Sequence, residues 1–89
     1  MATRTLRIVN EKGLHARASA KFVEVVEGFD ASAQVAREGM ECSGDSIMGL
    51  LMLAASRGTT IEVTTSGPQA DALMQALDRL VADRFGEDS

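Results

Sequence analysis

The sequence predicts an α+β fold in which helices pack on one face of a largely antiparallel sheet, in the order β-α-β-β-α-β-α. Segments that alternate polar and apolar side chains are interleaved with segments of helical period. Glu38 and Gly39 mark a tight reversal between two short strand-like segments, which predicts a β-hairpin in the middle of the chain. A length of 89 residues supports one hydrophobic core, so we expect a single domain over residues 1–89.

A strand and a helix are predicted at the start of the chain. Residues 3–9 alternate polar and apolar side chains, which is typical of a strand with one buried face. Residues 16–27 place their apolar side chains on one helical face, and Gly28 is suited to ending the helix. On the exposed face, Lys21 and Glu24 stand three residues apart and can form an ion pair.

The middle of the chain is predicted to contain the hairpin and a short helix. The hairpin strands cover residues 31–37 and 40–42. A helix follows over about residues 46–53, and the hydroxyl of Ser46 can cap its first turn. One plausible buried face of this helix consists of Ile47, Leu50, Leu51 and Ala54, which leaves Met48 and Met52 to other directions.

The last part of the chain is predicted to form a strand, a helix and a tail. Residues 60–66 are rich in β-branched side chains, which favours a strand. Ser66 and Gln69 have the spacing of a capping box, with Ser66 as the N-cap. The following helix keeps one apolar stripe from Ala70 to Val81. Residues 86–89 are expected to be a frayed acidic tail.

Composition disfavours several classes of function. The net charge of −4 and the 3% aromatic content speak against nucleic-acid binding, which needs a basic face or stacking platforms. No apolar run is long enough to span a membrane or resembles a signal peptide, so we expect a cytoplasmic protein without membrane insertion. No zinc spacing or nucleotide-binding loop is present, so neither a metal nor another cofactor is expected. Cys42, the single cysteine, is expected to be a packing residue.

Basic side chains concentrate near the N-terminus. Residues 1–21 carry five basic side chains against one acidic, a net of +4, whereas the remaining residues carry four basic and twelve acidic, a net of −8. An anion-handling site should therefore lie near the N-terminal end.

His15, the only histidine, is the candidate centre of such a site. It directly precedes a predicted helix, whose first N–H groups are unpaired and attract anions. Its imidazole is a nucleophile near neutral pH, and Arg17 can offer a bidentate guanidinium to a phosphate. These groups suit phosphoryl transfer. The pattern equally fits a surface histidine at a helix N-cap with Arg17 merely solvated.

Two segments resemble signatures of a known family. Residues 13–17, GLHAR, resemble the active-site signature of the HPr family, the histidine-containing phosphocarriers of the bacterial phosphotransferase system. Residues 46–54, SIMGLLMLA, resemble the family's second signature, and residues 58–63 resemble the strand that follows it. Residues 28–31 and 66–69, with the acidic end after Phe85, look closer to the nitrogen-related branch, NPr.

The resemblance implies an open-faced β-sandwich with three helices on a four-stranded antiparallel sheet. It implies that His15 is phosphorylated on Nδ1, with Arg17 assisting and the phosphate lying against residues Ala16, Arg17 and Ala18. The donor would be enzyme I, charged by phosphoenolpyruvate, and the acceptor a IIA-type protein or domain. Such a protein carries a phosphohistidine intermediate but is not a turnover enzyme by itself.

Ala18 and Ser19 depart from the Pro-Ala that usually follows the arginine in the family. Proline near a helix start fixes φ without losing a needed hydrogen bond, so its absence should loosen the first turn slightly. We expect the Ser19 hydroxyl to face water.

Residues 47–53 are almost entirely apolar, and a helix this short cannot bury every side. We expect an exposed docking patch formed by Ile47, Met48, Leu51 and Met52, because flexible thioethers adapt to several partners. The alternative is a fully buried helix whose methionines fill gaps in the core. In part of the family, the serine that matches Ser46 is phosphorylated by an HPr serine kinase/phosphorylase.

Two other functions remain open from the sequence. The chain could be a regulatory binding module that acts through the surface of residues 47–53 and is controlled by phosphorylation of Ser46. It could also be a ferredoxin-like α+β domain of another role, which would explain the element order but neither signature.

Overall fold

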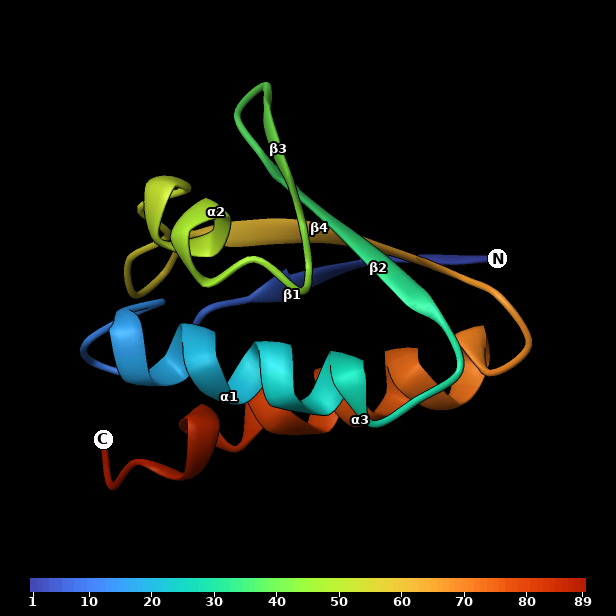
Figure 1. Ribbon diagram of the computed structural model, residues 1–89. Coiled ribbons are helices and arrows are strands. Elements are labelled where there is room, and N and C mark those ends of the chain that lie inside the picture. Colours follow the sequence, from blue (N-terminus) through green and yellow to red (C-terminus); the bar gives the residue numbers. More distant parts are fainter.

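The computed structural model describes residues 1–89 as four strands, three α-helices and a short 3-10 helix (Figure 1). The order β-α-β-β-α-β-α is confirmed. The elements are β1 (Ala2–Arg7), α1 (Ala16–Glu27), β2 (Ser32–Arg37), β3 (Met40–Ser43), α2 (Ile47–Met52), β4 (Thr60–Ser66), α3 (Ala70–Ala82) and η1 (Arg84–Gly86).

The four strands form one antiparallel sheet in the order β1-β4-β2-β3. Leu6 pairs with Ile61, and Val35 pairs with Val63. Residues opposite each other in an antiparallel sheet point to the same side, so these four buried side chains build one apolar face.

The helices cover this apolar face. Figure 1 shows α1 and α3 side by side beneath the sheet, and α2 packs against α1 and β3. The chain ends at the same end of the molecule as the start of α1. No helix combines the length and the apolar character that crossing a bilayer requires.

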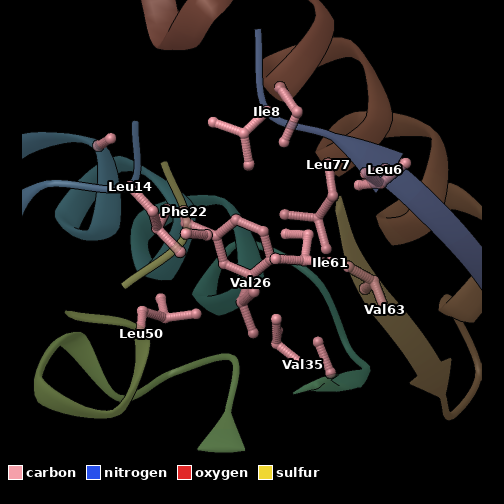
Figure 2. Close-up of a cluster of buried hydrophobic side chains, with 14 of the residues drawn as sticks. Leu6, Ile8, Leu14, Phe22, Val26, Val35, Leu50, Ile61, Val63 and Leu77 are labelled. Atoms are coloured by element: carbon pink, nitrogen blue, oxygen red, sulfur yellow. The ribbon is translucent and has the colours of Figure 1, made fainter. Parts of the chain in front are cut away.

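The core is one cluster of 19 buried residues contributed by the sheet, all three helices and the loops between them. Figure 2 shows the ring of Phe22 in the middle of the cluster, with Leu14, Val26 and Ile61 around it. Phe85 of η1 is also completely buried, so the segment after α3 is anchored in the same core.

The capping box predicted at Ser66 is wrong. Ser66 is the last residue of β4, and its hydroxyl lies 2.9 Å from that of Ser32. Gln69, whose side chain accepts a hydrogen bond from the N–H of Asp30, is the N-cap of α3. The chain turns before the helix because Gly67 adopts a φ of +108° close to the backbone of Ala31.

The predicted buried face of α2 is also only partly right. Leu50 and Leu53 are buried, whereas Ile47 is 40% exposed and Ala54 is exposed. The helix has only six residues, and Ala54 follows it with a φ of +52°, so the chain leaves the helix before a second face can pack.

Candidate functional site

His15 is the N-cap residue of α1. Its backbone is extended, with φ −79° and ψ −176°, and its side chain makes no capping hydrogen bond. Its carbonyl accepts the first hydrogen bond of the helix, from the N–H of Ser19 at 2.8 Å. The imidazole is therefore free to turn away from the helix, and 28% of its side-chain surface is exposed.

The loop before His15 is held by close backbone packing. Gly13 adopts a φ of +66°, and a Cβ placed there would lie 2.6 Å from the carbonyl oxygen of Ala55. The next N–H, that of Leu14, donates to this same carbonyl at 2.8 Å. Only glycine fits this position without strain, so the glycine of the GLHAR segment fixes where His15 enters the helix.

The first turn of α1 offers unused donors beside His15. Because the first helical hydrogen bond runs from Ser19 to His15, the N–H groups of Ala16, Arg17 and Ala18 have no acceptor within the helix. A helix N-terminus with free N–H groups favours a bound anion. The three residues predicted to hold phosphate are thus the ones whose N–H groups have no acceptor within the helix.

Three cationic side chains surround the same end of the helix. Lys12, Arg17 and Lys21 line one hollow together with residues 86–89, and none of the three forms an ion pair. The predicted pair of Lys21 with Glu24 is therefore wrong. The Lys21 ammonium instead donates to the carbonyl of Phe85 at 2.6 Å.

The C-terminal segment contacts His15, so the expectation of a frayed tail is wrong. Nε2 of His15 lies 2.5 Å from Oε2 of Glu87, and Nδ2 of Asn10 donates to Oε1 of Glu87 at 3.2 Å. The hydrogen bond from His15 is the main cause that lowers the pKa of Glu87 below its ordinary value of 4.5. Partial burial opposes this shift, while the Asn10 hydrogen bond and the charges of His15 and Lys12 add to it.

Asn10 and Glu87 are the site residues that sequence reasoning missed. Asn10 is completely buried, and its amide also donates to the carbonyl of Gly13 at 2.8 Å. The signal available in the sequence was Phe85, a large apolar residue isolated after the last helix. Its burial brings Glu87 back to His15.

Ser19 does not face water. Its side chain is completely buried, and its hydroxyl lies 3.4 Å from the carbonyl of Leu14, to which it donates a long hydrogen bond. The first turn of α1 is packed against its own preceding loop, so the side chain at this position points inward.

Comparison with known proteins identifies the family. The family described as PTS HPr component phosphorylation site matches residues 2–83. The chain belongs to the HPr family. As a member, it is a phosphocarrier of the phosphotransferase system.

Relatives match this HPr-family chain over nearly its whole length. The phosphocarrier protein HPr of Cupriavidus necator is 44% identical over 98% of each chain. The phosphocarrier protein NPr of Escherichia coli is 39% identical over 94% of each chain. The crystal structure of HPr-C-His from Thermoanaerobacter tengcongensis superposes with a TM-score of 0.94 at 31% identity, covering 100% of both chains. The predicted family and fold are thus confirmed.

The second signature of this HPr-family chain forms an exposed apolar patch. Met48 and Met52 are 68% and 66% exposed, and Ile47 joins them, whereas Leu51 is half-buried. Ser46 begins the helix as its N-cap, and its hydroxyl accepts a hydrogen bond from the N–H of Gly49 at 3.0 Å. Cys42 is half-buried against the core, and this burial raises the pKa of its thiol.

Proposed function

We propose that residues 1–89 act as one phosphocarrier domain in which Nδ1 of His15 accepts a phosphoryl group from enzyme I and passes it to a IIA-type protein. The observation that carries this proposal is the position of the imidazole. It is partly exposed at a helix N-terminus, beside free N–H groups and an unpaired arginine. The proposal includes a cytoplasmic location for this activity.

Each neighbouring group has a role that follows from charge. The phosphoryl group carries negative charge throughout the transfer, so a transfer site must stabilise that charge. The N–H groups of residues 16–18 and the positive end of the α1 dipole supply one part of this stabilisation. The Arg17 guanidinium, which no carboxylate engages, can supply the other.

The test is phosphorylation by purified enzyme I with phosphoenolpyruvate. We expect the wild-type protein to take up one acid-labile phosphate and to lose it on addition of a IIA-type acceptor. His15→Ala should take up none. Full labelling of His15→Ala would disprove the proposal, because no other histidine is present in the chain.

A second role is favoured by the exposed patch of Ile47, Met48 and Met52. We propose that this patch binds both enzyme I and the IIA-type protein, and that phosphorylation of Ser46 regulates this binding. A phosphoserine there would add about two negative charges at neutral pH next to the patch. Ser46→Asp should then slow transfer from enzyme I while Ser46→Ala does not. A regulatory binding module would be the main role instead if Ser46→Asp altered cellular behaviour and His15→Ala left it unchanged.

A further inference from the structure

We infer that Glu87 is a positioning residue that holds the proton of the neutral His15 imidazole on Nε2 and so leaves Nδ1 as the nucleophile. This inference rests on the proposed function, and it assigns to the C-terminal segment a part in the reaction. Glu87 lies 72 positions from His15 in sequence, yet its carboxylate contacts the ring.

The chemistry of the contact determines which nitrogen carries the proton. An ionised carboxylate can only accept hydrogen bonds, so the ring nitrogen 2.5 Å from Oε2 must be the donor. A neutral imidazole has one N–H. If that N–H is on Nε2, the lone pair available for attack is on Nδ1.

Glu87 is held in place through both its side chain and the backbone that precedes it. Its other oxygen accepts from Asn10, whose buried amide also donates to the carbonyl of Gly13 in the loop that delivers His15. The backbone before Glu87 is held by the buried ring of Phe85 and by the hydrogen bond from Lys21 to the Phe85 carbonyl. One amide thus ties the tail to the histidine loop, which keeps carboxylate and ring in register.

The carboxylate also matches the charge that develops during transfer. The Nδ1 lone pair forms the bond to phosphorus, and the bond to the donor breaks with its electron pair remaining on the donor. The ring keeps its Nε2 proton and becomes cationic, and the Glu87 carboxylate balances this charge. On transfer to the acceptor, the electron pair of the N–P bond returns to Nδ1. Lys12, Arg17 and Lys21, around the same hollow, offset repulsion between Glu87 and the phosphoryl group.

The test combines NMR of the His15 ring nitrogens with the rate of phosphorylation by enzyme I. In the wild type, we expect the neutral ring to be mainly the Nε2–H form. Glu87→Ala should shift it toward a mixture and slow phosphorylation on the order of tenfold, as for other residues that orient a functional imidazole. Glu87→Gln retains an oxygen that can accept a hydrogen bond from Nε2–H but carries no charge, so the proton should stay on Nε2 while the rate falls.

Asp83→Asn is the matched control. It removes one carboxylate at the C-terminal end of α3, and this side chain forms neither a hydrogen bond nor an ion pair with His15. We expect it to match the wild type in both measurements. If Glu87→Ala leaves the tautomer unchanged, or is phosphorylated as fast as the wild type or faster, the inference is overturned; a faster rate would mean that the tail obstructs the ring.

The two proposals fail in different ways. If the wild type takes up no phosphate, the proposed function fails, whereas the NMR measurement needs no partner and still tests the contact. If the wild type is phosphorylated and His15→Ala is not, but Glu87→Ala behaves like the wild type, only the role of Glu87 is lost.

Discussion

Lys21 and Phe85 are joined across 64 positions of sequence by a hydrogen bond of 2.6 Å from the Lys21 ammonium to the Phe85 carbonyl. The bond ties the second turn of α1 to the segment after α3. The Phe85 ring is meanwhile completely buried in the core. The C-terminal segment is therefore part of the folded site, and its anchoring can be tested by substitution.

Phe85→Ala should destabilise the fold and release the tail. Removing a completely buried phenyl ring costs about 3 kcal/mol of unfolding free energy. We expect the His15 ring to lose its contact with Glu87 in the same variant. Urea unfolding gives the first quantity and NMR of the His15 ring the second. Met52→Ala, at a position 66% exposed, should leave stability nearly unchanged. Equal stability of the two variants would contradict the anchoring.

Gly13→Ala should cost more stability than Gly39→Ala. Both glycines have positive φ, which costs about 1 kcal/mol for alanine. A Cβ at Gly39 meets nothing within 4 Å, whereas one at Gly13 lies 2.6 Å from the carbonyl oxygen of Ala55. We expect about 2 kcal/mol of additional loss at Gly13 from this overlap. Chemical denaturation of the two variants measures the difference, and equal losses would show that the loop before His15 is not tightly packed.

Arg17→Ala should slow phosphoryl transfer with little effect on stability. The Arg17 side chain is exposed and forms no ion pair, so the folded state does not depend on it. Loss of a donor aimed at the moving charge costs roughly a hundredfold in rate. Arg79→Ala, which removes the same charge from α3, is the control for general electrostatics. The measurements are the phosphoryl-transfer rate and the melting temperature of each variant. A similar fall in rate for both variants would argue against a local role of Arg17.

The contact between His15 and Glu87 should persist to a pH below 4.5. The pKa of Glu87 is lowered, so its contribution to stability is complete above the ordinary value of 4.5 and is lost as the pH falls through the lowered pKa. An NMR titration of the Glu87 carboxyl carbon should give a midpoint below 4.5. In His15→Ala the midpoint should rise, because the hydrogen bond from His15 is the main cause of the shift. A wild-type midpoint at or above 4.5 would show that the contact is absent in solution.

The double variant Met48→Ala/Met52→Ala should weaken docking without unfolding the protein. Both side chains are about two-thirds exposed, so their truncation removes little core packing. If these two methionines contact enzyme I, the KM for this protein in the enzyme I reaction should rise about tenfold in the double variant. Met40→Ala, at a methionine 46% exposed on β3, is the matched control. The patch has no docking role if the control and the double variant give the same KM.

The sequence by itself determined the element order and the placement of His15 at a helix start. Both depend on local signals: the periods of 2 and 3.6 residues, the reversal at Glu38 and Gly39, and the glycine before the histidine. Local signals failed where they were ambiguous. The helix α2 is apolar on all sides, so periodicity could not say that Leu50 and Leu53 would be buried and Ile47 exposed.

Only the tertiary structure decided what contacts the His15 ring. Asn10, His15 and Glu87 come from separate parts of the chain, and no local pattern relates residues 77 or 72 positions apart. Their meeting depends on burial of Phe85, which is set by the space left in the core between the helices and the sheet. The side chain that carries the proposed chemistry could thus be found from the sequence, whereas the carboxylate that orients it depends on how the last residues pack.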